Sequence, residues 1–119
     1  MSRGNEAIGT LTIPSGAAVS PALSSILSQG QMKVLGSMVE LAIYSPAALT
    51  TAMVVQIAPE YPGVNWKTMQ QDGADIVPTA GDVILVRNPV FLDLRIQGAG
   101  NEAADRDFTL MGKLDYPDN

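Results

Sequence analysis

The chain of 119 residues contains no cysteine and no histidine. Without cysteine it can form neither a disulfide bond nor a thiolate site. Without histidine it lacks the commonest general base and the commonest metal ligand of proteins. We therefore expect a protein that is not an enzyme, with no catalytic, cofactor-binding or metal-binding residues and no cofactor.

Charged residues are also scarce, at 16% of the chain, and the net charge is -5. The seven basic residues are scattered along the sequence, whereas binding to phosphates requires clustered lysine and arginine. There is neither an apolar run long enough to span a membrane nor a basic amphipathic segment. We expect no nucleic acid and no membrane among the partners. A surface poor in charge is common at protein interfaces, and it also suits a small β-protein with serine, threonine and glutamine outside.

The length and the apolar content of 46% fit one compact domain with its own hydrophobic core. The first residues lack the apolar run and the cleavage site of a signal peptide. We expect a protein that is made and used inside a cell, or exported as part of something larger.

Short segments rich in β-branched residues alternate with glycine and proline turns along the whole chain. The predicted strands are residues 8–13, 33–44, 51–58, 64–71, 74–77, 82–87, 90–97 and 108–114. About eight short strands at regular spacing predict an all-β fold, an antiparallel β-sandwich or jelly roll. We expect an N-terminal arm at residues 1–7, the domain at 8–114 and a C-terminal tail at 115–119.

Several local patterns within these segments are specific enough to test. Asp72-Gly73 predicts a hairpin, because a type I′ turn needs positive φ at both central residues. Residues 33–44 predict a strand bent near Gly36, and residues 17–31 either a crossing loop or one short helical turn. Alternation assigns side chains to the core or to water, as follows. Leu11, Ile13, Leu92, Leu94, Ile96, Phe108, Leu110 and Leu114 face the core, and Asp93, Arg95 and Gln97 face water.

Candidate reactive groups have simpler structural explanations. The serines Ser24, Ser25 and Ser28 lack a base, so we interpret them as part of a polar loop. Carboxylate pairs that could serve glycoside hydrolysis, Asp72 with Asp75 and Asp105 with Asp107, fall in predicted turns. The oxygen-bearing group Asn101, Glu102, Asp105 and Asp107 could hold calcium, but its spacing favours a solvated loop. Tyr61 and Trp66 could form a small sugar-binding platform, but a packed core position for Trp66 is favoured.

Motifs along nearly the whole chain resemble a family of small β-sandwich proteins encoded among the head and tail genes of tailed bacteriophages. The chain opens with TLTIPSG at residues 10–16 and continues with PAALTTAMVVQ at 46–56. A G-x-x-W turn at 63–66 and a hairpin follow. The chain closes with LRIQG at 94–98 and NEAADRDFTL at 101–110.

This resemblance implies a virion component of the cement or decoration type, a homo-oligomer that contacts the major capsid protein. Such a protein is made in the host cytoplasm and ends on the capsid surface. The alternative is a tail-associated or carbohydrate-binding β-sandwich module that contacts a host surface. The chain departs from the family pattern at residues 24–31 and around Pro59 and Pro62, where loops could meet a partner.

Overall fold

A computed structural model describes residues 2–116 as an all-β domain of nine antiparallel strands and three short helical segments. The strands are β1 (Ser2–Ile13), β2 (Met38–Tyr44), β3 (Met53–Ala58), β4 (Lys67–Thr68), β5 (Gln70–Gln71), β6 (Ala74–Asp75), β7 (Val83–Arg87), β8 (Asp93–Gly98) and β9 (Arg106–Tyr116). The helical segments are the 3-10 helices η1 (Leu23–Ser25) and η2 (Leu35–Ser37) and the α-helix α1 (Gln29–Val34). The predicted all-β, antiparallel fold is confirmed.

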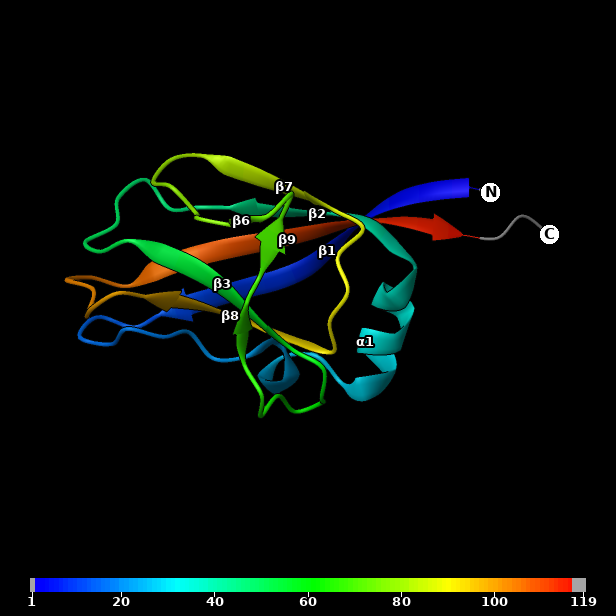
Figure 1. The fold of residues 1–119 in the computed structure, drawn as a ribbon, viewed down its shortest axis with the longest axis horizontal. Helices are drawn as coiled ribbons and strands as arrows, with labels where there is room; N and C mark the ends of the chain where they lie inside the picture. The colour runs from blue at the N-terminus through cyan, green and yellow to red at the C-terminus, as the bar shows by residue number, and fades with distance from the viewer. Residues whose placement is uncertain (1, 117–119) are drawn as a thin grey trace.

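Two sheets form the sandwich, and a small hairpin sits beside them (Figure 1). Sheet A has the strand order β1-β9-β2-β7, and sheet B has the order β4-β3-β8. The segment after β1 adds a single antiparallel bridge from Val19 to Gln97 of β8. The helix α1 closes the end of the sandwich where β1 begins and β9 ends (Figure 1).

The connectivity is that of a jelly roll. The Val19 bridge stands in the place of a second strand, and the β5–β6 hairpin is an insertion outside the two sheets. Counted in this way, the eight strands in chain order are β1, the Val19 segment, β2, β3, β4, β7, β8 and β9. The first, eighth, third and sixth of them form sheet A, and the second, seventh, fourth and fifth form sheet B. Two interleaved sheets in this order are the double-sheet arrangement that jelly rolls use to limit exposed strand edges.

The core lies between the two sheets and is formed by side chains that alternate along each strand. Its fully buried members include Leu11, Ile13, Leu41, Ile43, Phe108, Leu110 and Leu114 from sheet A, and Met53, Val55, Leu94 and Ile96 from sheet B. The inward positions predicted for Leu11, Ile13, Leu94, Ile96, Phe108, Leu110 and Leu114 are confirmed. Burial of this many aliphatic side chains supplies the main favourable free energy of folding.

Residues 2–7, predicted as an unpaired arm, continue strand β1. They pair antiparallel with the end of β9, from Ser2 opposite Tyr116 to Ala7 opposite Met111. A β-bulge at Ile8, between Ala7 and Gly9, separates this extension from the rest of β1. The segment lacks the alternation of apolar residues that predicts a strand, and it is ordered by backbone pairing to the equally extended β9. Met1 and residues 117–119 of the predicted tail lie outside the described residues.

The end of helix α1 and the 3-10 helix η2 replace the first part of the strand predicted at residues 33–44. The hydroxyl of Ser28 accepts the backbone N–H of Gln31, and the Gln31 side chain accepts the N–H of Ser28. This reciprocal capping box satisfies two of the free donors at the helix start and overrides the helix-breaking effect of Gly30. The strand therefore begins at Met38, after Gly36.

Strand β8 corrects the alternation predicted for residues 92–97. Leu92 is half-exposed and belongs to the preceding loop, whereas Asp93 is completely buried at the first position of the strand. Alternation holds only within a regular strand, and at the strand start the side chain of Asp93 turns toward the loops at that end of the sandwich.

The predicted Asp72-Gly73 hairpin is confirmed by strands β5 and β6, with φ of 54° at Asp72 and 81° at Gly73. The hairpin lies beside β7, the edge of sheet A. The Gln71 side chain accepts the backbone N–H of Arg87 at 2.8 Å and reaches the carbonyl of Leu85 at 3.5 Å. Gln71 thereby occupies backbone groups that a foreign strand would need, a protection that natural edge strands require.

Replacing Gly73 with valine should destabilise the protein by about 1–2 kcal/mol, because a β-branched residue is strained at positive φ. Open space surrounds the position, so the loss reports backbone strain rather than a clash. Gly36→Val is the matched control, since Gly36 also faces open space but lies outside the left-handed region. Urea denaturation measures both variants. Equal stability of Gly73→Val and the wild type would contradict the turn geometry.

Candidate interaction surface

A buried carboxylate, Glu102, links the loops at one end of the sandwich. Its oxygens accept the backbone N–H groups of Thr50 and Thr51 at 2.7 and 2.9 Å, the Thr51 hydroxyl at 3.0 Å and Arg106 Nε at 2.9 Å. The side chain of Glu102 is fully buried. Burial alone would raise the pKa of Glu102, but the hydrogen bonds from Thr50, Arg106 and Thr51 outweigh it and lower the pKa to about 2.

A second buried carboxylate, Asp93, links the loops at the opposite end of the sandwich, where β8 begins. It accepts the backbone N–H and the hydroxyl of Ser24 at 3.0 and 2.6 Å, and the N–H groups of Gly63 and Leu94 at 2.8 and 2.9 Å. The hydroxyl of Tyr61 donates to the Leu27 and Ser24 carbonyls beside it. These bonds hold η1 and the loop around Gly63 against the start of β8.

The serines and carboxylates singled out in the sequence serve local structure. Ser24 binds Asp93, the Ser25 hydroxyl donates to the Ala22 carbonyl, and Ser28 caps α1. In the 101–107 loop the acids diverge, since Glu102 points inward while Asp105 accepts the Ser15 N–H and Asp107 accepts the Thr12 hydroxyl.

The other acidic pair, Asp72 and Asp75, also serves its own turn. Asp72 forms an exposed ion pair with Arg87, and Asp75 accepts from Gln70. No group of three or more potential metal-ligating side chains comes together among residues 2–116.

Trp66 lies outside the core, which differs from the predicted core position. Its half-buried ring packs against Gly63, and the Arg95 guanidinium sits 4.3 Å from the ring centroid. Arg95 is held in place by a 2.7 Å hydrogen bond from its Nε to Gln56. Tyr61 packs against the core and directs its hydroxyl to backbone carbonyls. The two aromatic rings therefore have protein partners, and a sugar that stacked on the Trp66 ring would have to displace Arg95.

The outer face of sheet A carries an apolar surface that the alternation of its strands leaves exposed. Three rows of residues cross the sheet in register: Val83-Tyr44-Thr109-Thr10, Leu85-Ala42-Met111-Ala7 and Arg87-Glu40-Lys113-Asn5. The side chains of Tyr44, Val83 and Leu85 are 45%, 46% and 52% exposed. An apolar centre bordered by a row of alternating charge has the composition of a protein interface.

A shallow hollow of about 160 Å³ lies on this face between Tyr44, Leu85, Met111 and Lys113. Sequence reasoning predicted the strands but not this surface, because its apolar residues come together only once β2, β7 and β9 are placed side by side. Within the described part of the chain, no helix is long and apolar enough to cross a membrane.

Replacing Glu102 with glutamine should destabilise the protein by about 3 kcal/mol at neutral pH. The variant leaves Arg106 without its charge partner, and the glutamine NH2 group faces N–H and O–H donors that the carboxylate accepts. The pKa of Glu102 is lowered from 4.5 to about 2, so its stabilising contribution is complete above about pH 4.5 and is lost as the pH falls toward 2. The stability difference between wild type and variant should shrink over that interval in urea denaturation.

The matched control is Asp75→Asn, an exposed carboxylate that should change stability by less than about 0.5 kcal/mol. A difference between the wild type and Glu102→Gln that stayed constant from pH 7 to about pH 2 would contradict the role assigned to the ionised Glu102.

Comparisons with known proteins return similarities of shape without a family. No protein-family model and no curated protein sequence matches the chain. The SPBc2 prophage-derived protein YomS superposes with a TM-score of 0.49 at 8% identity, over 94% of this chain and 93% of that one. A protein of the disulfide-linked pili that form Bacillus endospore appendages superposes with a TM-score of 0.45 at 16% identity, over 98% of this chain and 88% of that one. A chain of the virus-like particle of the extra small virus of the prawn Macrobrachium rosenbergii superposes with a TM-score of 0.29 at 10% identity, over 99% of this chain and 82% of that one.

Proposed function

We propose that the chain is a structural protein of a tailed-phage virion, a cement or decoration protein with no enzymatic role. In this proposal it binds the outside of the capsid through the outer face of sheet A and stabilises contacts between major capsid subunits. The observation that carries the proposal is the exposed apolar surface formed by Tyr44, Val83 and Leu85.

The construction of the domain supports a role in binding large surfaces. The outer face of sheet A belongs to paired strands, so its backbone is in place before any partner arrives. Preformed surfaces lose little conformational entropy on binding. The loops at both ends are held by the buried carboxylates Glu102 and Asp93. The motif resemblance to small phage β-sandwich proteins supplies the class of partner, the major capsid protein.

The proposal predicts that Leu85→Glu weakens binding to capsids of the phage that encodes the chain by at least about tenfold, because it puts a charge in the apolar centre of the interface. Val90→Glu is the matched control, since Val90 is 84% exposed and lies outside sheet A. Co-sedimentation of purified protein with capsids measures both variants, and urea denaturation checks that both remain folded.

Electron microscopy of the native particle tests the position directly. We expect density at local two-fold or three-fold positions of the capsid, with the outer face of sheet A toward the shell. Density at the tail would replace this proposal with the tail-associated module. Equal capsid binding of Leu85→Glu and wild type would exclude the outer face of sheet A as the contact.

A further inference from the structure

The β5–β6 hairpin lies against β7, the strand that forms one edge of sheet A (Figure 1). The backbone N–H of Arg87 donates to Oε1 of Gln71 at 2.8 Å, and Nε2 of Gln71 donates to the Leu85 carbonyl at 3.5 Å. One side-chain amide thus bonds two backbone groups on the outward side of β7. This is the side on which a further strand of the sheet would pair.

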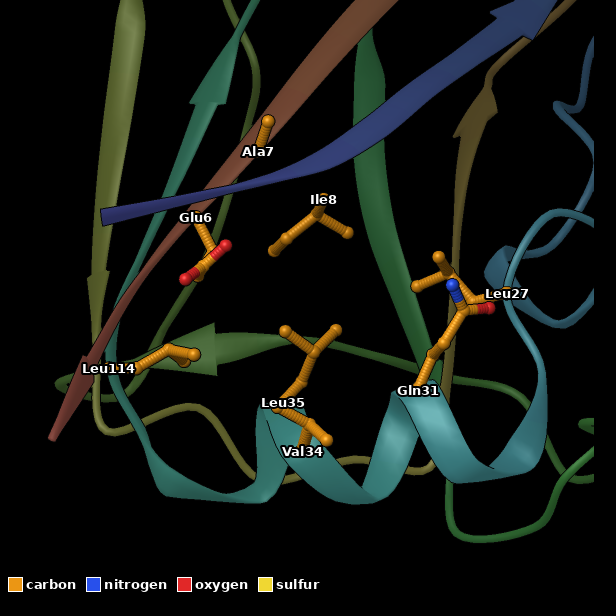
Figure 2. A pocket seen from close by; sticks show the side chains of 8 residues that line it. All are labelled: Glu6, Ala7, Ile8, Leu27, Gln31, Val34, Leu35 and Leu114. Carbon is orange, nitrogen blue, oxygen red and sulfur yellow. The ribbon is translucent and has the colours of Figure 1, made fainter. Parts of the chain in front are cut away.

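Strand β7 has few protections of its own. It reads Val-Ile-Leu-Val-Arg, with no proline and a charge only at its end, and its pairing with β2 contains no bulge. Prolines, bulges and charges keep natural edge strands from pairing with other chains, and apolar β-branched runs without them pair readily. The opposite edge, β1, differs because it carries Glu6 and the bulge at Ile8. Figure 2 shows helix α1 opposite this part of β1, across a hollow of about 260 Å³.

The hairpin is anchored in the core at its base and tethered to β7 near its tip. Met69 and Ile76, at the base, are 3% and 5% exposed, and the Ile76 N–H donates to the Met69 carbonyl at 3.0 Å. Near the tip, an exposed 2.7 Å ion pair between Asp72 and Arg87 adds to the bonds of Gln71. Exposed ion pairs contribute little free energy. Substitutions at the tip can therefore release it from β7 while the base stays in place.

We infer that β7 is a strand edge able to pair with β7 of a second copy of this chain, and that the side chains of Gln71 and Asp72 keep this edge closed. The outward backbone groups belong to Leu85 and Arg87 and, by alternation, to Val83. Two antiparallel β7 strands pair through these groups about a two-fold axis at Leu85. Val83 of each copy then lies opposite Arg87 of the other, and the two copies of sheet A form one continuous sheet.

A second copy fits this edge because the register is self-complementary. The side chains of Val83, Leu85 and Arg87 are 46%, 52% and 61% exposed on the outer face of sheet A. In the pair, the two Leu85 side chains lie next to each other, and no two groups of like charge lie directly opposite each other. The inference concerns the free protein and does not depend on the proposed capsid contact.

The double variant Gln71→Ala/Asp72→Asn tests the inference, because it removes both tethers and keeps a turn that asparagine and glycine favour. Sedimentation equilibrium of the full chain should give a dimer whose Kd is at least about tenfold lower than that of wild type. Gln70→Ala is the matched control. Gln70 bonds Asp75 within the hairpin at 2.8 Å, so this variant should self-associate no more than wild type.

Two further substitutions in the double variant identify the contact. Leu85→Lys places like charges side by side across the two-fold axis and should weaken the dimer at least about tenfold. Val83→Glu faces Arg87 of the other copy and should strengthen the dimer. Association through the outer face of sheet A would instead be weakened by both substitutions, since both put a charge on that apolar surface.

A dimer that Val83→Glu fails to strengthen, or that Leu85→Lys leaves unchanged, would overturn the inference. So would a double variant that is folded, as urea denaturation checks, and self-associates no more than wild type. The single variant Gln71→Ala takes the place of the double variant in all these measurements if the double variant does not fold.

Discussion

The burial of two carboxylates is the constraint on which the arrangement of the loops depends. An ionised carboxylate away from water is costly unless several donors surround it. Glu102 and Asp93 each receive four hydrogen bonds, of which two to Glu102 and three to Asp93 come from backbone N–H groups. The donors to each carboxylate lie in segments that are far apart in the sequence. The loops must therefore take one position, because any other leaves a buried charge without partners.

The two carboxylates lie just before and just after the body of β8, so they fix loops at both ends of the sandwich. Asp93 begins the strand, and Glu102 follows four residues after its last residue, Gly98. Each carboxylate fixes the crossing loops at its own end, and the apolar core fixes the sheets between them. The surfaces held in place by this framework include the apolar outer face of sheet A.

The sequence allowed prediction of features that depend on local chemistry. Asp72-Gly73 predicts its own turn because only certain residues accept positive φ, and the alternation in β9 predicts its core face. The capping box of Ser28 and Gln31 was also present in the sequence as Ser-x-x-Gln, although the neighbouring Gly30 concealed it. Breaks at glycine and proline placed most strand ends to within a few residues.

Features that depend on distant partners could not be predicted in this way. Asp93 resembles any solvated residue between two leucines, and its burial follows from Ser24 and Gly63, which are 69 and 30 residues away. Residues 2–7 become a strand only because β9 extends equally far. The apolar surface on sheet A requires the register of three strands, which no local pattern contains.

Amide hydrogen exchange tests the central claim, that buried carboxylates fix the loops, most directly. At neutral pH the amides of Thr50 and Thr51, together with those of Ser24 and Gly63, should exchange far more slowly than amides in unstructured loops. In Glu102→Gln, exchange should accelerate at Thr50 and Thr51, while Ser24 and Gly63 beside Asp93 keep their protection. Exchange of Thr50 and Thr51 at the rate of an unfolded peptide in the wild type would contradict the account.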